Sequence, residues 1–175
     1  MIIQLHRIEV LSKKDMEMID ITPEMDRLVE ASGAKQGIVF VTTAHTTSSI
    51  VVTEGVECLE RDIPAHLERL APKNPPDGTY GYYHNRLLDF DGRLGYNAAD
   101  HLKSVLGGIQ TFFPIEDGKV VRGGRQRVYF VEWDGPLART VFIQLSQADD
   151  RVPQRGDVVD SGEQPVLTRR GGEDD

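Results

Sequence analysis

The sequence predicts a single domain of the α+β class, on three observations. Runs of β-branched and aromatic residues recur along the chain, and the clearest is residues 37–43, Gly-Ile-Val-Phe-Val-Thr-Thr. Two other segments, residues 22–33 and 56–70, carry apolar residues at the spacing of amphipathic helices. The length of 175 residues fits one domain with enough chain to bury a core.

The chain begins with elements that are expected to be two strands and a helix. Residues 2–11 and 18–21 are rich in β-forming residues and are separated by a polar turn. Thr22 then suits the N-cap of a helix, and Pro23 suits its first turn. Gly33 is expected to end this helix, because glycine adopts the left-handed conformation that terminates helices.

The next elements are expected to be two strands and a second helix. Residues 37–43 form a continuous apolar run, which is typical of a strand buried on both faces. Residues 46–53 predict another strand, and residues 56–70 a helix that Pro64 is expected to kink. Cys58 occupies an apolar position of that helix and is expected in the core.

The C-terminal half begins with a long polar stretch, residues 71–94, whose tyrosines and histidine favour a functional loop. A short helix capped by Asn97 is expected to follow it. Residues 116–118, Glu-Asp-Gly, predict a hairpin turn among three further strands, expected at residues 109–114, 128–133 and 140–145. The domain is expected to span residues 1–147, and the polar residues 148–175 to form a disordered tail.

The overall charge narrows the classes of partner. A formal net charge of −8 repels a phosphate backbone, so we expect no nucleic-acid partner. No apolar stretch approaches the length of a membrane span, and the N-terminal residues do not resemble a signal peptide. The single cysteine excludes both an intrachain disulfide and a cysteine-based zinc cluster. We therefore expect a cytoplasmic protein without a membrane partner.

Three histidine-containing segments are candidates for an active pocket. His45 follows the apolar strand and begins a run of hydroxyl side chains that includes Thr46 and Ser49. His84 lies beside three tyrosines of the long loop, and His101 lies in the short helix. If the three histidines converged, they would match a catalytic zinc site with an open position. Each could equally be a local structural residue, because no compact metal-binding spacing is present.

Two acidic residues and one glycine pair are further candidates. Glu54 and Asp62 follow His45 in sequence, and either could act as a general base or bind Mg²⁺, or could lie at a strand end and on a solvated helix face. Gly123 and Gly124 lie among arginines, so their backbone N–H groups could cradle a phosphate. The alternative for this segment is an exposed turn with solubilising arginines.

In this order, the segments resemble the YjbQ family of small proteins, from residue 2 to residue 145. The matching residues are His45-Thr46-Thr47-x-Ser49, Thr53-Glu54, Asp62, Tyr82-x-His84, Asn97-x-x-x-His101-x-Lys103, Gly118-x-Val120, Gly123-x-x-Gln126, and Glu132-x-Asp134-Gly135-Pro136 with Arg139. Family members usually carry a Gly-Thr-Trp-Gln-like segment where this chain has Gly123-Gly124-Arg125-Gln126. Two other departures are Asn85, where an acidic residue is common, and Ala99, where a proline is common.

The resemblance implies an α+β fold with an antiparallel or mixed β-sandwich-like core and two or three helices. It also implies a homotrimer with sites near the subunit interfaces, and one pocket that gathers His45, His84 and His101. Family members are associated with a modest thiamine-phosphate synthase activity, which joins a pyrimidine methyl pyrophosphate to a thiazole phosphate and releases pyrophosphate. The partner would then be a phosphorylated small molecule.

Three functional hypotheses follow. The leading one is a thiamine-phosphate-synthase-like transferase assisted by a divalent metal, zinc or magnesium, held by the histidines or by Glu54 and Asp62. The second is a zinc hydrolase that uses the three histidines as ligands, and the third is a trimeric binding module without turnover. The residues expected to bind substrate or phosphate are Thr46, Ser49, Asn97, Arg122, Gly123, Gly124 and Gln126.

Overall fold

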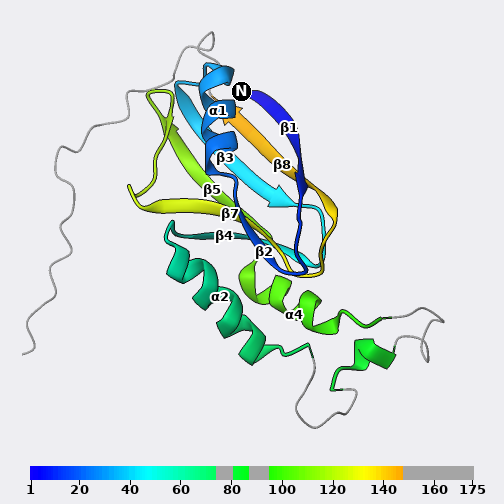
Figure 1. Ribbon diagram of the computed structural model, residues 1–175. Coiled ribbons are helices and arrows are strands. Elements are labelled where there is room, and N and C mark those ends of the chain that lie inside the picture. The colour runs from blue at the N-terminus through cyan, green and yellow to red at the C-terminus, as the bar shows by residue number, and fades with distance from the viewer. Residues whose placement is uncertain (74–80, 87–94, 148–175) are drawn as a thin grey trace, which may run out of the picture.

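The structure is a computed structural model that describes residues 1–73, 81–86 and 95–147 (Figure 1). Its helical elements are α1 (Thr22–Ser32), α2 (Glu57–Leu70), the 3₁₀ turn η1 (Tyr83–Arg86) and α4 (Ala98–Gly107). Its strands are β1 (Ile2–Leu11), β2 (Glu17–Asp20), β3 (Gln36–Thr43), β4 (Ser48–Glu54), β5 (Gln110–Glu116), β6 (Lys119–Val120), β7 (Gln126–Glu132) and β8 (Ala138–Gln147). The predicted tail, residues 148–175, lies outside the described residues.

The strands form two antiparallel sheets. One has five strands in the order β1-β8-β3-β5-β6, and the other has three in the order β2-β7-β4. Helix α1 lies across the five-stranded sheet, whereas α2 and α4 lie together beside β4 of the smaller sheet (Figure 1). The α+β class and the antiparallel sheets are therefore confirmed, with three α-helices among the described residues.

The core lies between the inner faces of the two sheets and α1. It combines α1 residues such as Met25 and Val29 with Val39 of β3, Ile143 of β8 and Phe130 of β7, all of them buried. Side chains from segments more than one hundred residues apart thus share one apolar cluster. Burial of this apolar surface is the main favourable contribution to folding.

The outer face of the five-stranded sheet is not buried within one chain, which corrects the prediction that residues 37–43 are covered on both sides. Ile38 of β3 is 49% exposed and Phe112 of β5 is 65% exposed. Across this face, one cross-strand row runs through Leu5, Gln144, Phe40 and Phe112. The run is continuously apolar, yet only every second residue contacts the core.

Helix α1 begins and ends as expected, but its cap differs. The hydroxyl of Thr22 does not cap the helix; it accepts a hydrogen bond from the backbone N–H of Val128 at 2.8 Å, on strand β7. Gly33 follows the last helical residue with φ 68°, the left-handed conformation that the sequence predicts there. The N-cap residue is Ile21 rather than Thr22, and the side chain of Asp20 accepts the backbone N–H of Thr22 at 2.8 Å.

Helix α2 covers the smaller sheet less completely than its pattern suggests. Pro64 is its buried residue, and the hydrophobic residues Ile63 and Leu67 are only half-buried. Cys58 is exposed, so its predicted core position is wrong. Among the helices in the described part of the chain, none is long and apolar enough to cross a membrane.

The ladder between β4 and β7 determines which candidate residues can meet. Ser48 pairs with Glu132 at one end of this ladder, and Glu54 pairs with Gln126 at the other. Six residues separate Ser48 from Glu54, and at about 3.3 Å per residue the two ends lie about 20 Å apart. Side chains placed at opposite ends therefore belong to different neighbourhoods of one chain.

Candidate functional site

His45 lies in the connection between β3 and β4, where a hydrogen bond selects one tautomer. Its Nε2 accepts the backbone N–H of Thr140 at 3.0 Å. Nε2 therefore carries the lone pair, and the proton of the neutral ring lies on Nδ1. Burial, together with the positive charge of Arg139, lowers the pKa of His45. Both effects favour a neutral ring that presents an N–H donor at Nδ1.

His84 and His101 form a pair, with ring centroids 4.9 Å apart and an edge-to-face arrangement. His84 comes from η1, and His101 comes from α4. The Nδ1 atom of His101 lies 3.1 Å from the carbonyl oxygen of Thr46. Because a carbonyl can only accept, Nδ1 of His101 is the donor and its Nε2 keeps a lone pair. The residue next to His45 therefore orients His101.

Asn97 orients the other member of this pair. It occupies the N-cap position of α4, but its side chain does not cap the helix. Its amide nitrogen donates to Asp134 Oδ2 at 2.7 Å, so its Oδ1 is free to accept from His84 Nε2, 3.1 Å away. The acceptor-only carboxylate of Asp134 thus sets the amide orientation, and the amide sets the tautomer of His84. His84 keeps its lone pair on Nδ1.

A buried ion pair lies behind the histidines. Arg139 donates from Nε to Glu132 Oε2 at 2.6 Å and from one terminal nitrogen to Glu132 Oε1 at 3.0 Å. Glu132 is fully buried, and its hydrogen bonds with Arg139 raise the pKa of the guanidinium. The same carboxylate accepts the backbone N–H of Asp134, while Arg139 also donates to the hydroxyl of Thr47. This ion pair therefore supports His45, through the backbone next to Arg139, and His84, through Asp134 and Asn97.

Two predicted ligand-binding residues of the β3–β4 connection have structural roles. Ser49 is fully buried; its hydroxyl donates to Ser104 and accepts the indole N–H of Trp133 at 2.9 Å. It is not available to a phosphate. Thr46 is exposed and contributes its backbone carbonyl, which binds His101. For these two residues the prediction named the right segment, but the wrong role for Ser49.

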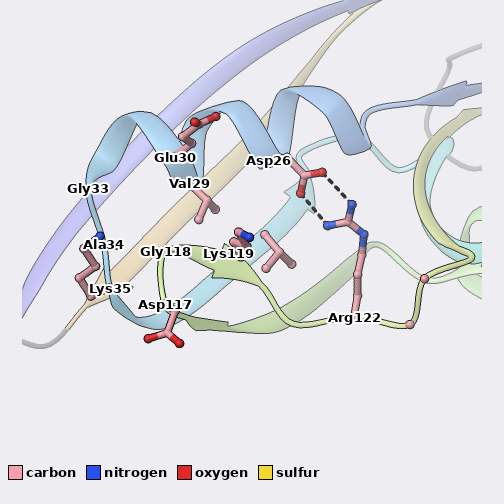
Figure 2. A pocket seen from close by; sticks show the side chains of 13 residues that line it. Asp26, Val29, Glu30, Gly33, Ala34, Lys35, Asp117, Gly118, Lys119 and Arg122 are labelled. Carbon is pink, nitrogen blue, oxygen red and sulfur yellow. Dashed lines mark hydrogen bonds and ion pairs between the residues drawn. The ribbon is translucent and has the colours of Figure 1, made fainter.

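The glycine-rich segment is at a different place from the histidines. Arg122, Gly123 and Gly124 line a cavity of about 600 Å³ between the C-terminal half of α1 and the β5–β6 hairpin, shown in Figure 2. In that view the guanidinium of Arg122 faces the carboxylate of Asp26, which it binds through two hydrogen bonds of 2.6 and 2.7 Å. The backbone N–H of Gly123 donates to the side chain of Gln126 at 2.7 Å.

Within one chain, two groups of the predicted phosphate cradle already have partners. The positive charge of Arg122 is already balanced by Asp26, and the N–H of Gly123 already has an acceptor. Gln126 is at the end of the β4–β7 ladder opposite to the histidine site. The segment has the arginine and backbone N–H groups that bind anions, but Asp26 and Gln126 already accept hydrogen bonds from them.

The two acidic candidates also lie away from the histidines. Glu54 is at the far end of β4 and accepts a hydrogen bond from Arg125 at 2.8 Å. Asp62 is exposed on α2, beside a groove that includes His66 and Leu106. Among the described residues, neither carboxylate belongs to a metal-holding group with His45, His84 or His101.

The donor set fits a metal only in part. Among residues 1–73, 81–86 and 95–147, no group of three or more His, Cys, Asp or Glu side chains is arranged to hold a metal ion. The lone pair of His45 Nε2 is used by Thr140, which explains why the predicted three-histidine set is not met in one chain. His84 and His101 do fit, because each has one nitrogen bound to an oxygen acceptor and a lone pair on the other.

Three charged residues of the site, Glu132, Asp134 and Arg139, have no local sequence signal that marks them as functional. They connect the histidines, and the sequence indicates them only as positions that match the family. Their local signal is a Glu-x-Asp pair at the end of a strand with an arginine shortly after it. Such a pair is common on protein surfaces, so burial of Glu132 was the missing information.

Comparisons with known proteins agree with this fold. The model of the family described as UPF0047 protein YjbQ-like matches residues 6–148. A UPF0047 protein of Archaeoglobus fulgidus is 39% identical over 131 residues, which cover 75% of this chain and 92% of the relative. A UPF0047 protein of Methanothermobacter thermautotrophicus is 35% identical over 136 residues, covering 77% and 86%.

Solved structures of proteins in the same family have a similar fold. A YbjQ-like protein of unknown function from Sulfolobus solfataricus aligns with a TM-score of 0.73 at 31% identity, covering 83% of this chain and 98% of that one. An uncharacterized conserved protein of the yjbq/upf0047 family from Clostridium acetobutylicum aligns with a TM-score of 0.70 at 30% identity, covering 81% and 99%. The chain therefore belongs to the YjbQ-like UPF0047 family.

Proposed function

We propose that this protein is an enzyme that acts on a phosphorylated small molecule at the site of His45, His84 and His101. The reaction we propose is thiamine-phosphate-synthase-like: a pyrimidine methyl pyrophosphate and a thiazole phosphate give thiamine phosphate and pyrophosphate. The observation that carries the proposal is the proton arrangement of the three rings. His45 has its N–H at Nδ1, whereas His84 and His101 keep lone pairs at Nδ1 and Nε2. The three rings therefore offer one donor and two acceptors, which we propose act in one pocket.

This arrangement suits the departure of a pyrophosphate. In the proposed reaction the thiazole nitrogen attacks the methylene carbon, the carbon–oxygen bond breaks, and pyrophosphate leaves with the electron pair. The N–H of His45 can donate to an oxygen on which negative charge develops, and positioned donors of this kind often contribute a factor of about a hundred or more in rate. His84 and His101 can accept protons from the substrate or, when protonated, neutralise the leaving group.

A divalent metal, zinc or magnesium, remains part of the proposal. His84 and His101 would hold it through their free lone pairs, and it would neutralise charge on the pyrophosphate. The same two histidines favour the second candidate, a zinc hydrolase, because a second nitrogen bound to an oxygen acceptor is the usual setting of zinc-binding histidines. A binding module without turnover is the outcome that remains if neither reaction occurs.

We further propose that the protein works as a homotrimer in the cytoplasm. The apolar outer face of the five-stranded sheet supports an assembly, since Ile38 and Phe112 are exposed there in one chain. In an assembly, the segment of Arg122 and Gly123 from one subunit could approach the histidines of its neighbour. A cytoplasmic location suits substrates that are phosphorylated and cannot cross a membrane unaided.

The test is direct product formation by the full-length protein. We would incubate it with both substrates and Mg²⁺ or Zn²⁺, and detect thiamine phosphate after chemical oxidation to its fluorescent derivative. His45→Ala and His84→Ala are each expected to lower the rate at least about a hundredfold. His66→Ala, an exposed histidine on α2, is the matched control and should keep full activity.

Three outcomes decide between the candidates. Product that depends on His45 and His84 supports the transferase. No product, but hydrolysis of a phosphate ester that zinc restores after chelation, supports the hydrolase and contradicts the transferase. Binding of the substrates without turnover under either metal contradicts both enzymes and leaves the binding module.

A further inference from the structure

A group of charges with two buried members, Asp100 and Lys103, lies where the end of α2 meets the first turns of α4. The side chain of Asp100 is 3% exposed and that of Lys103 is 4% exposed. Asp100 Oδ1 lies 3.4 Å from Lys73 Nζ and 3.6 Å from Lys103 Nζ. Lys103 also donates to Glu68 of α2 at 2.5 Å, and Lys73 to Asp15 at 2.7 Å. One carboxylate thus lies between two ammonium groups from different segments.

These charges link three parts of the chain that are far apart in sequence. Asp15 belongs to the turn before β2, Glu68 and Lys73 belong to the end of α2 and the residues after it, and Asp100 and Lys103 belong to α4. Lys73 and Lys103 also line one cavity of about 850 Å³ together with Trp133. The group is therefore not a set of local helix-surface pairs.

Asp100 shares its helical turn with two residues of the histidine site. The carbonyl of Asn97 accepts the backbone N–H groups of both Asp100 and His101, at 3.1 and 3.2 Å. From this turn, the side chains of Asn97 and His101 reach His84 and Thr46, whereas that of Asp100 reaches the two lysines. A rotation of the turn would therefore move both of the contacts that set the histidine tautomers.

We propose that Asp100, held between Lys73 and Lys103, is a positioning residue that sets the orientation of His101 and Asn97. This inference rests on the proposed function for its consequence in catalysis, but its structural content is independent of any substrate. Asp100 touches no reacting atom. It acts because its contacts with the lysines hold one side of the first turn of α4, and the other side of that turn carries Asn97 and His101.

The geometry of Asp100 is better explained by positioning than by stability. Its Oδ1 is buried and makes no hydrogen bond of good geometry within the described residues, and the two lysine Nζ atoms lie 3.4 and 3.6 Å from it. Burial raises the pKa of Asp100 in spite of both lysines. Asp100→Asn leaves Lys103 paired with Glu68 and Lys73 paired with Asp15. Both lysines keep a counter-charge, so the asparagine variant is expected to fold.

The test compares the full-length wild-type protein with Asp100→Asn, using NMR of ¹⁵N-labelled histidine side chains. In the wild type, His84 is expected to show a proton on Nε2 and His101 a proton on Nδ1 at neutral pH. In Asp100→Asn, both rings should shift toward averaged tautomers, while His66 keeps its signals. Glu57→Gln, which breaks an exposed ion pair with Arg61 on α2, is the matched control and should change none of these signals.

A second readout is the affinity for Zn²⁺ alone, measured by calorimetry. Loss of a residue that orients metal ligands typically weakens binding about 10- to 100-fold, so Asp100→Asn should lose affinity in this range and Asp100→Glu should recover part of it. If the wild type binds no Zn²⁺ and forms no product, the proposed function fails, but the NMR comparison still decides the role of Asp100.

The proposal is overturned if Asp100→Asn leaves the His84 and His101 signals as they are in the wild type. If Asp100→Asn does not fold, Lys73→Met takes its place in the test. Lys73→Met removes one of the two lysines that hold Asp100 and leaves Asp100 paired with Lys103. Shifted His101 signals in folded Lys73→Met would support the proposal, and unchanged signals would contradict it.

Discussion

Glu132 and Arg139 form a buried ion pair with two hydrogen bonds, and this pair connects the neighbourhoods of His45 and His84. On one side, Arg139 precedes Thr140, whose backbone N–H binds His45. On the other side, Glu132 accepts the N–H of Asp134, whose carboxylate orients Asn97 and, through it, His84. A single pair of opposite charges thus determines the position of groups that are 39 residues apart in sequence, from His45 to His84.

Replacement of Glu132 by glutamine tests this relationship. The variant keeps the shape of the side chain but removes the charge that pairs directly with the guanidinium of Arg139, whose side chain is 13% exposed. Breaking one member of a buried pair typically costs about 3–5 kcal/mol, so the free energy of unfolding should fall by about this amount in urea titrations. Glu57→Gln, which breaks an exposed pair, should leave it unchanged. An equal, small effect of both variants would contradict the role given to Glu132.

The pKa of His45 gives a second prediction, about pH. Its pKa in the folded state is lowered from the ordinary value of about 6.5 by burial and by Arg139. The unfolded chain therefore binds a proton at a higher pH than the folded chain does, and the free energy of unfolding should fall as the pH drops below about 6.5. Above that pH the ring is neutral in both states and contributes no dependence.

His45→Gln separates this effect from other titrations. Glutamine can accept the N–H of Thr140 but does not titrate, so the difference in unfolding free energy between wild type and variant should narrow or reverse as the pH falls from 7.5 to 5. The measurement is a series of urea titrations at fixed salt. A difference that is constant over this range would show that the folded and unfolded pKa values of His45 are equal.

Local pattern was sufficient for most elements of the fold. Strand β1 and the end of α1 at Gly33 follow from residues close in sequence, and both are found where expected. The two errors at the helix starts have one physical cause, a distant partner that replaces a local one. Thr22 binds β7 instead of capping α1, and Asn97 binds Asp134 and His84 instead of capping α4.

The candidate site shows the same limit. The spacing of His45, His84 and His101 carries no information about their distance in space, and their expected convergence came from the family resemblance. The pairing of Arg122 with Asp26, 96 residues earlier, likewise has no signal in the local sequence. In each case burial and long-range pairing decide which polar group is free to bind a ligand, and a local sequence pattern predicts neither of them.

A third prediction concerns the buried hydroxyl of Ser49. In Ser49→Ala the indole N–H of Trp133, which is 1% exposed, loses its acceptor. A buried donor without a partner costs about 1–3 kcal/mol, and the unfolding free energy should fall by that amount. In a Trp133→Phe background the same substitution should cost less, because the donor is already gone. Equal costs in both backgrounds would contradict the importance of this hydrogen bond.

The last prediction tests whether the outer sheet face is an interface between copies of this chain. One cross-strand row on that face runs through Leu5, Gln144, Phe40 and Phe112, and Phe112 is 65% exposed in one chain. If the face is covered in a homotrimer, Phe112→Lys places an unpaired charge in the interface. A penalty of about 3 kcal/mol weakens association by about a hundredfold or more, so the variant should sediment as a monomer at concentrations where the wild type has three times the chain mass.

Met16→Lys is the control for this measurement, since it adds the same charge in the turn between β1 and β2. It should leave the mass of the wild-type assembly unchanged. A wild-type protein that sediments as a monomer would contradict the trimer outright, and a trimer that persists in Phe112→Lys would place the interface on another surface. Because the segment of Arg122 is at the end of the β4–β7 ladder opposite to the histidines, loss of activity together with loss of assembly would further indicate that a neighbouring subunit completes the site.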